Sequence, residues 1–369
     1  MGVHRRTLLA VVCVPVVATG LAACSGTAQP VASSSGGSSA SAAATSGASG
    51  RAGGATFGPA GFDLQSHRGG RGETTEESLR AFEKSLRLGV TTLEMDIVLT
   101  KDKVPAVWHD PKVLDTKCAD TKPASAGDPQ FPYVGKLVHD LTWAQLQTLD
   151  CSKKLKGFPD AESVGGNKIA QLSDVFALTK RLNSDVWYNI ETKIEADKPA
   201  DSAAPQEFVD AILAEVDKAG RADRVMIQSF DWRSLPMVKA KNAKIPTVLL
   251  WDETTWVADS PWTADVTVES VKADIVEAAK KIKADVLSPG YSLPYGRKPG
   301  DADFRLVADK ALVERAHAAG MKVVPWTIND PSAMEAQIDA GADGIITDYP
   351  TRLRDIMAKR DMELPRSYR

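Results

Sequence analysis

The feature that most constrains the fold is a regular alternation of short β-like runs and helix-like runs that begins near residue 62. Eight runs have the character of strands: Phe62–His67, Thr92–Val98, Asp185–Thr192, Arg224–Phe230, Ile245–Trp251, Ala284–Ser288, Lys322–Thr327 and Gly344–Thr347. A helix-like run follows each strand: Glu76–Leu88, Leu172–Leu182, Pro205–Ala219, Trp232–Lys241, Val271–Ile282, Val307–Ala319, Ala333–Ala340 and Arg352–Lys359. Eight such pairs in roughly 300 residues predict an α/β fold, a (β/α)8 TIM barrel.

One further β-like run, Val104–His109, does not belong to the eight. Only residues 100–103 separate it from the second strand, whereas a parallel crossover needs about a dozen residues. The two runs must therefore pair as an antiparallel hairpin, which would bring His109 over the mouth of the barrel. The hairpin opens an insertion from about residue 98 to residue 170, in which Leu141–Leu146 has the pattern of a short capped helix.

Residues 1–23 have the organisation of an export signal. A basic start precedes an apolar stretch, and the Leu-Ala-Ala-Cys tetrapeptide that ends at Cys24 resembles a bacterial lipobox, in which the cysteine is lipidated. An ordinary signal peptide cleaved nearby is the alternative. Residues 24–61 are rich in Ser, Ala and Gly and predict a disordered tether. We therefore expect an exported protein, anchored by this lipid to the outer face of the bacterial cytoplasmic membrane, with residues 62–369 as its globular barrel domain.

The charge of the chain argues against one class of partner. Residues 1–23 contain two arginines and no acidic residue, so their removal takes the formal charge from −3 to −5. Domains that bind nucleic acid carry basic surfaces. We therefore expect no nucleic acid partner.

Two cysteines remain once the signal and the lipidated residue are set aside. Cys118 and Cys151 form an even pair in an exported protein, which predicts a disulfide. That bond would close a loop of about 34 residues and contribute about 3–4 kcal/mol by the chain-entropy model. A Cys/His metal site is the alternative, although only His139 lies near the two cysteines in the sequence.

The second predicted strand carries two carboxylates on one face. Side chains alternate across a strand, so Glu94 and Asp96 lie opposite the apolar Leu93, Met95 and Ile97. Adjacent like charges raise each other's pKa unless a cation lies between them. The pattern therefore favours a metal site, with a solvated edge strand as the alternative.

Other charged residues end neighbouring strands on the same side of the predicted barrel. His67 ends the first strand, and Glu191 and Lys193 end the third. In (β/α)8 barrels the C-terminal ends of the strands carry the chemistry. We therefore expect these side chains to meet Glu94 and Asp96 at one mouth of the barrel.

The ordered set of motifs resembles the glycerophosphodiester phosphodiesterase family, as a bacterial lipoprotein member. The motifs are His67-Arg68-Gly69, Glu94-Met95-Asp96, His109-Asp110, Glu191-Thr192-Lys193, Gln228-Ser229-Phe230, Trp326-Thr327-Ile328-Asn329 and Asp343 to Pro350. They extend over almost the whole globular part, with the insertion in the expected place.

The resemblance implies the roles of the site residues. It implies one divalent cation held by Glu94, Asp96 and Glu191, and a catalytic acid–base pair formed by His67 and His109. Arg68 and Lys193 match family positions that contact the substrate phosphate. Three carboxylates without sulfur suit a hard cation, and the sequence leaves Ca²⁺ and Mg²⁺ both open.

Four further residues are candidates for the surroundings of the site. The family usually has Pro-Glu-Asn-Thr after the His-Arg-Gly turn, whereas this chain has Thr-Glu-Glu-Ser. Glu76 either reaches the site or favours the first turn of its helix. Gln228, Phe230 and Trp326 are expected in a second layer or in the wall of the pocket.

The resemblance implies a metal-dependent hydrolase that cleaves small glycerophosphodiesters to sn-glycerol 3-phosphate and an alcohol. Within the enzyme class, the alternative is a phospholipase C- or D-like enzyme that acts on intact lipids. Outside it, the alternative is a substrate-binding lipoprotein without catalysis. Two histidines argue against that alternative, because binding alone needs no acid–base pair.

Overall fold

The structure, a computed structural model, describes residues 57–369. The predicted signal peptide, the lipobox with Cys24 and nearly all of the tether lie outside these residues.

Eight parallel strands of the described chain form a nearly closed barrel. They are β1 (Asp63–Ser66), β2 (Thr92–Leu99), β4 (Trp187–Thr192), β5 (Val225–Ser229), β6 (Thr247–Trp251), β7 (Val286–Pro289), β10 (Lys322–Val323) and β11 (Gly344–Thr347). Neighbours follow the order β10-β7-β6-β5-β4-β2-β1-β11. Backbone hydrogen bonds from Asp343 to Val323 (2.8 Å) and from Ile346 to Pro325 (3.0 Å) join the two end strands. The predicted barrel is therefore confirmed.

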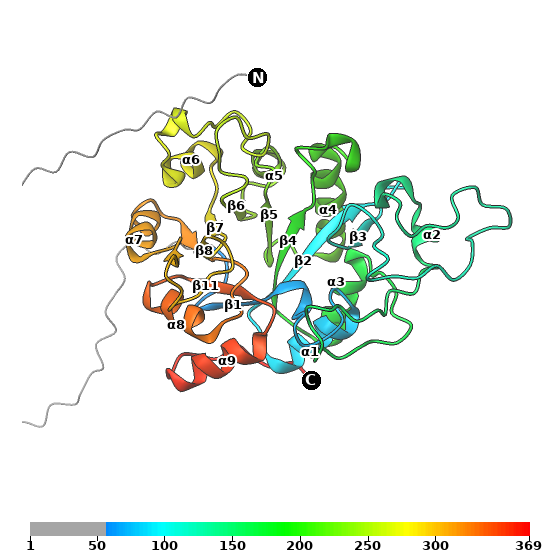
Figure 1. Cartoon of the computed structure of the whole chain (residues 1–369), viewed down its shortest axis with the longest axis horizontal. Helices are drawn as coiled ribbons and strands as arrows, with labels where there is room; N and C mark the ends of the chain where they lie inside the picture. The colour runs from blue at the N-terminus through cyan, green and yellow to red at the C-terminus, as the bar shows by residue number, and fades with distance from the viewer. Residues whose placement is uncertain (1–56) are drawn as a thin grey trace, which may run out of the picture. The chain divides into compact units, whose positions relative to one another are not determined.

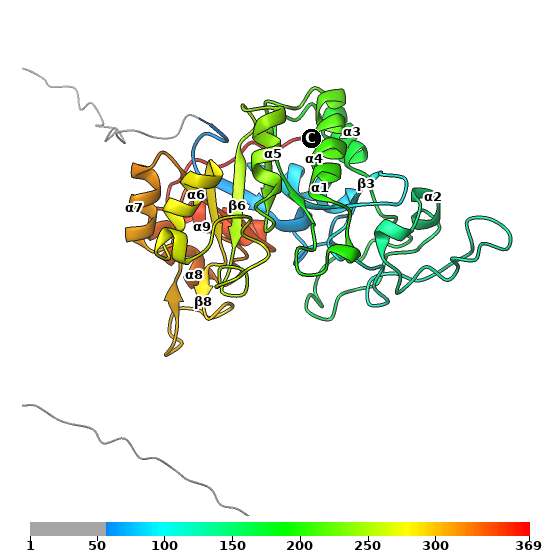
Figure 2. The same cartoon turned by 90° about the horizontal axis from the view of Figure 1, so that it is seen from above.

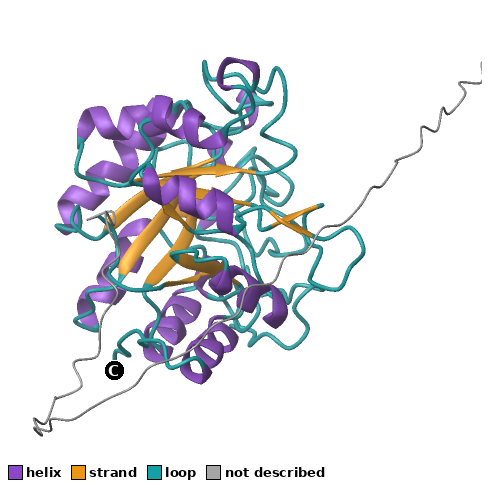
Figure 3. Ribbon diagram, turned by 90° about the vertical axis from the view of Figure 1, so that its left-hand side faces the viewer, coloured by secondary structure: helices purple, strands orange, loops and turns teal. Residues whose placement is uncertain are grey.

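Helices surround the strands on the outside (Figures 1 and 3). They are α1 (Leu79–Leu88), α3 (Leu172–Arg181), α4 (Pro205–Ala219), α5 (Ser234–Lys241), α6 (Ile275–Ile282), α7 (Lys310–Ala318), α8 (Pro331–Asp339) and α9 (Pro350–Lys359). Buried outward-facing residues of β2 and β4, such as Leu93 and Ile190, pack against helix residues such as Phe82 and Phe208. None of the helices in residues 57–369 is long and apolar enough to cross a membrane.

Helix α1 begins three residues later than the sequence pattern predicted. Glu77 has a positive φ of 55°, which helical residues do not adopt. Ser78 then caps the helix by accepting a hydrogen bond from the Ala81 backbone (3.0 Å). Glu76 consequently lies outside the helix.

The insertion after β2 has little regular structure. It begins with β3 (Pro105–Val107), which pairs antiparallel to β2 as predicted, and it contains the short helix α2 (Trp143–Leu146), capped by Thr142. The structure links Cys118 and Cys151 by a disulfide. Both cysteines are buried in an apolar cluster that the insertion shares with β2 and β3. The insertion extends to one side of the barrel in Figures 1 and 2.

A second excursion was not predicted from the sequence. The hairpin of β8 (Ser292–Leu293) and β9 (Arg305–Leu306) follows β7 and projects from the barrel (Figure 2). Short 3-10 turns complete the elements of the described residues: η1 (His67–Gly69), η2 (Val138–Asp140), η3 (Pro199–Asp201) and η4 (Glu269–Val271).

Candidate active site

Three carboxylates meet at the C-terminal end of the barrel strands. The register of β2 and β4 places Asp96 opposite Glu191, and Glu94 points the same way as Asp96 because side chains alternate along a strand. One oxygen of each of the three residues lies within 4.8 Å of the other two. All three residues are buried. We call Glu94, Asp96 and Glu191 the carboxylate cluster.

The carboxylate cluster places like charges close together away from water. Burial, reinforced by the charge of Asp96, raises the pKa of Glu94 well above its usual value. Burial also raises the pKa of Glu191 to about 8, although the Lys193 charge opposes this shift. A cation between the oxygens would favour the ionised forms. Because every donor is a carboxylate oxygen, the cluster fits a hard divalent cation such as Ca²⁺ or Mg²⁺.

Two cationic side chains border the carboxylate cluster. Arg68 Nε lies 2.9 Å from Asp96 Oδ2, and Lys193 Nζ lies 2.9 Å from Glu191 Oε1. The Arg68 backbone N–H also donates to Glu94 Oε2 (2.8 Å), from a turn in which Arg68 has a positive φ of 50°. Burial acts to raise the pKa of Asp96, but the nearby positive charges, with Arg68 first, hold it well below its usual value.

His67 is held by a carboxylate from the far end of the chain. Its Nδ1 lies 2.5 Å from Asp348 Oδ1, and its Nε2 lies 4.0 Å from Glu94 Oε2. Asp348 also accepts hydrogen bonds from Arg71 Nε (2.9 Å) and Asn329 Nδ2 (2.7 Å). Burial lowers the pKa of His67, although Asp348 opposes the shift.

His109 is held in the same manner by its neighbour in the sequence. It follows β3, and its Nδ1 lies 3.2 Å from Asp110 Oδ1. Burial, with the charges of Arg68 and Lys193, lowers the pKa of His109 to about 3. Both histidines thus have Nδ1 next to a carboxylate, which leaves Nε2 available for a substrate.

One pocket with a volume of about 130 Å³ is lined by both histidines, both cationic side chains, and Glu94 and Glu191 of the carboxylate cluster. Gln228 donates to Glu94 Oε1 (2.7 Å), which places it directly behind the carboxylate cluster. Phe230 and Trp326 form an aromatic wall, with ring centroids 5.3 Å apart. Tyr295, from the β8–β9 hairpin, extends this wall with its ring 5.3 Å from that of Trp326. The structure therefore brings together every residue that the sequence placed at the mouth of the barrel.

The sequence left two roles open for the Glu76 side chain, and the structure shows its contacts. It lies before the helix, and its Oε2 is 3.5 Å from Arg68 Nη1. It also pairs with Lys117 of the insertion. Glu77 is buried as well, and its Oε1 accepts a hydrogen bond from the Asp96 backbone (3.2 Å). Glu76 therefore contacts Arg68, a residue that lines the pocket, and is absent from the lining itself.

Sequence reasoning missed several residues of the site. Asp348 and Asn329 belong to motifs that were recognised, but no role was assigned to them. Their places at the ends of the last two predicted strands could have indicated one. Lys117 and Tyr295 lie in irregular segments, where no periodicity indicates which way a side chain points.

The chain is similar to proteins of one family over most of its globular part. A family model described as the glycerophosphoryl diester phosphodiesterase family matches residues 67–352. A glycerophosphodiester phosphodiesterase of Caldanaerobacter subterraneus subsp. tengcongensis is 27% identical over 294 residues, which cover 80% of this chain and 97% of the relative. Human lysophospholipase D is 24% identical over 298 residues, which cover 79% of this chain and 85% of the relative.

Solved structures agree with this similarity. A candidate glycerophosphoryl diester phosphodiesterase of Silicibacter pomeroyi superposes with a TM-score of 0.67 at 25% identity. The match covers 83% of this chain and 97% of that protein.

Proposed function

The chain belongs to the glycerophosphoryl diester phosphodiesterase family of hydrolases, and from this premise we propose that it cleaves small glycerophosphodiesters to sn-glycerol 3-phosphate and an alcohol through metal-dependent acid–base catalysis. One observation carries the proposal. His67 and His109 line the same pocket as Glu94 and Glu191 of the carboxylate cluster, and each histidine has its own carboxylate at Nδ1. A site that only binds its ligand needs no such pair.

Glu94, Asp96 and Glu191 would hold one divalent cation, Ca²⁺ or Mg²⁺. When bound, the cation supplies positive charge that polarises the phosphoryl oxygens. Arg68 and Lys193 line the same pocket and would contact the phosphate directly. Charge-assisted hydrogen bonds from these groups stabilise the negative charge that develops on phosphate.

His67 and His109 would move the protons. One imidazole accepts the proton of the glycerol 2-hydroxyl, whose oxygen forms a bond to phosphorus. The bond from phosphorus to the departing alcohol breaks, and the other imidazole, which enters this step as the imidazolium beside the negative phosphate of the bound substrate, gives its Nε2 proton to that oxygen. Water then opens the cyclic phosphate to give glycerol 3-phosphate. The intramolecular attack benefits from proximity, because the hydroxyl and the phosphorus belong to one molecule.

Turnover of glycerophosphocholine by the purified protein tests the proposed reaction. We expect release of glycerol 3-phosphate, with a loss of about 10²–10⁴-fold in rate when His67 or His109 is replaced by Ala. A propanediol phosphodiester that lacks the 2-hydroxyl tests the intramolecular step. Hydrolysis of this analogue as fast as the glycerol compound would mean that water attacks phosphorus directly.

A lysophospholipid is the second candidate substrate. The similarity to human lysophospholipase D and the aromatic wall of Phe230, Trp326 and Tyr295 favour it. A comparison of kcat/KM for lysophosphatidylcholine and glycerophosphocholine separates the two candidates. The polar charged pocket leads us to expect the higher value for the soluble diester.

We further propose that the protein is exported and anchored to the membrane by a lipid on Cys24, on the strength of the sequence pattern. Labelling of bacterial cultures with a fatty acid should mark the wild-type protein. The Cys24→Ala variant should carry no label and should leave the membrane fraction. Equal labelling of both proteins would refute the anchor.

A further inference from the structure

Lys117 brings a buried positive charge from the insertion to the edge of the candidate active site. Its side chain is 10% exposed, and its Nζ lies 2.5 Å from Asp110 Oδ2. The same Nζ forms an ion pair with Glu76 Oε1 and lies 4.9 Å from the centroid of the Trp108 ring. One ammonium group therefore joins two carboxylates from separate parts of the chain.

Each of these carboxylates has a second partner in the reaction machinery. Asp110 uses its other oxygen, Oδ1, for His109 Nδ1 at 3.2 Å. Glu76 uses Oε2 for Arg68 Nη1 at 3.5 Å. Lys117 is therefore one contact away from a proposed proton carrier and from a proposed phosphate ligand. It is absent from the residues that line the catalytic pocket.

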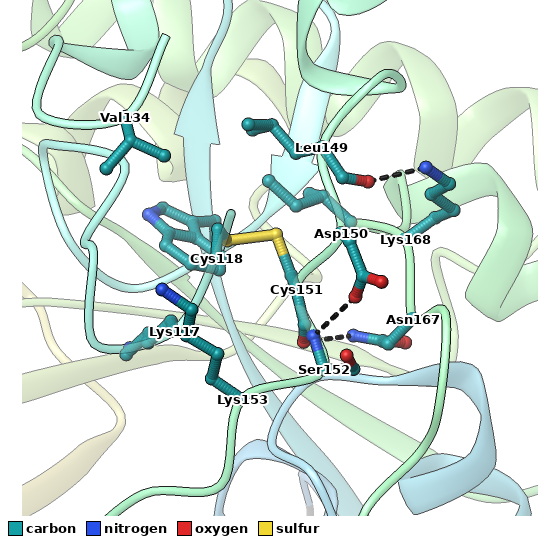
Figure 4. Close-up of a disulfide and its surroundings, with 12 residues drawn as sticks. Lys117, Cys118, Val134, Leu149, Asp150, Cys151, Ser152, Lys153, Asn167 and Lys168 are labelled. Carbon is teal, nitrogen blue, oxygen red and sulfur yellow. Dashed lines mark hydrogen bonds between the residues drawn. A yellow bond between two sulfur atoms is a disulfide. The ribbon is translucent and has the colours of Figure 1, made fainter. Parts of the chain in front are cut away.

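The insertion holds Lys117 in place through its backbone. Its N–H donates to the Leu114 carbonyl (3.1 Å), and its own carbonyl accepts from the Lys153 N–H (3.2 Å). The next residue, Cys118, is linked by the disulfide to Cys151, beside which Lys117 lies in Figure 4. A lysine side chain costs up to about 2 kcal/mol of rotamer entropy to immobilise, so a fixed backbone improves the precision of its contacts.

The charge of Lys117 is maintained by its partners. Burial acts to lower the pKa of Lys117, but the Glu76 and Asp110 carboxylates raise it above its usual value. Removal of one partner from a buried ion pair leaves an uncompensated charge, which is far more costly than the loss of the contact itself. Without Lys117, Glu76 and Asp110 would have to reorganise, and both touch functional groups.

We propose that Lys117 is a positioning residue, which fixes the orientation of His109 through Asp110 and of Arg68 through Glu76. This inference rests on the proposed function. It gives the insertion a second role in catalysis beside that of His109, because the insertion supplies the ammonium group that joins Asp110 to Glu76.

The test compares Lys117→Met with Lys153→Met in the full-length protein. Methionine keeps much of the length of the side chain and removes the charge. Lys153 is a matched control, because it lies in the same insertion and its exposed Nζ donates to the Asp115 carbonyl (2.7 Å). We expect Lys117→Met to lower kcat about 10–100-fold with little change in KM, as is typical for a partner of a reacting group. We expect Lys153→Met to keep wild-type kcat.

A double-mutant cycle separates positioning from a general structural role. If Lys117 acts through Asp110, Lys117→Met should cost much less kcat in an Asp110→Asn background than in the wild type. Full additivity of the two losses would overturn the proposal. Wild-type kcat in Lys117→Met, or an equal loss in Lys153→Met, would do so as well.

A readout that needs no turnover keeps this inference separate from the proposed function. In protein labelled with ¹⁵N-histidine, Lys117→Met should shift the ring signals of His109 and leave those of His139 and His317 in place. If the uncharged Lys117→Met variant does not fold, Lys117→Arg takes its place in the test. Lys117→Arg keeps the charge and should therefore preserve the wild-type spectrum. The positioning role would be refuted if the His109 ring signals stayed unchanged in Lys117→Met. It would also be refuted if a folded Lys117→Arg protein lost the wild-type His109 signals. An inactive wild-type protein would instead refute the proposed function.

Discussion

Replacement of Asp348 by Asn should disable His67 without removing any proposed metal ligand. Asp348 Oδ1 accepts from His67 Nδ1 and Arg71 Nε, and Oδ2 accepts from Asn329 Nδ2. An amide at this position offers one oxygen and one NH₂ group. If the amide oxygen accepts the hydrogen bonds from His67 and Arg71, the amide NH₂ group faces the NH₂ group of Asn329, and two donors meet.

Asn329 cannot turn its amide without a further loss. Its Oδ1 accepts from the backbone N–H of residue 348 (3.0 Å) and from Thr347 Oγ1 (3.3 Å). Either orientation therefore leaves a buried donor without an acceptor, at a cost of about 1–3 kcal/mol in stability. The imidazole also loses the negative charge that holds its tautomer, so we expect kcat to fall about 10²–10⁴-fold.

The assay is the release of glycerol 3-phosphate from glycerophosphocholine at saturating substrate, with cation affinity measured by titration calorimetry. Cation affinity should stay near the wild-type value, because Asp348 is outside the carboxylate cluster. Asp343→Asn is the matched control. Asp343 Oδ2 lies 2.7 Å from His317 Nε2, and neither residue lines the pocket. We expect this control to lose stability and to keep its kcat. A folded Asp348→Asn protein with wild-type kcat would refute the role given to His67.

Three further predictions concern the disulfide, the carboxylate cluster and the acid stability of the protein. The paired substitution of Cys118 and Cys151 by Ser should lower the free energy of unfolding by about 3–4 kcal/mol in urea titrations, because the disulfide closes a long loop; an unchanged midpoint would contradict this. Glu191→Gln should weaken Ca²⁺ or Mg²⁺ binding in calorimetry, and unchanged affinity would exclude Glu191 as a ligand. The pKa of Asp348 is held below its usual value, because His67 and Arg71 outweigh burial, so its contribution to stability is present above about pH 4 and is lost as the pH falls further. Acid titrations of unfolding should show a smaller decline for Asp348→Asn than for the wild type.

The barrel and the centre of its site could be predicted because their signals are periodic. Side chains alternate along a strand with a period of two, which places Glu94 and Asp96 on one face. A closed barrel brings the C-terminal ends of its strands together, and the details of the connecting helices do not change this. The register of β2 and β4, which parallel pairing alone leaves open, places Glu191 opposite Asp96. Hairpin geometry likewise predicted that β3 returns along β2 and carries His109 to the mouth.

The missing parts depend on irregular backbone. Because Glu77 has a positive φ, helix α1 begins after it, and Glu76 lies outside the helix in contact with Arg68. A hydrophobic pattern in the sequence does not indicate such a dihedral angle. Lys117 reaches the site through the insertion, whose path depends on a disulfide and an apolar cluster rather than on periodicity. Tyr295 comes from a hairpin of two-residue strands, which are too short to leave a sequence signal.

The most direct test of the central claim is the cation dependence of glycerol 3-phosphate release from glycerophosphocholine by the purified protein. We predict that an excess of chelator abolishes release and that added Ca²⁺ or Mg²⁺ restores it, because in the proposed mechanism the carboxylate cluster would act on the phosphate through a bound cation. Full turnover in excess chelator would contradict the account.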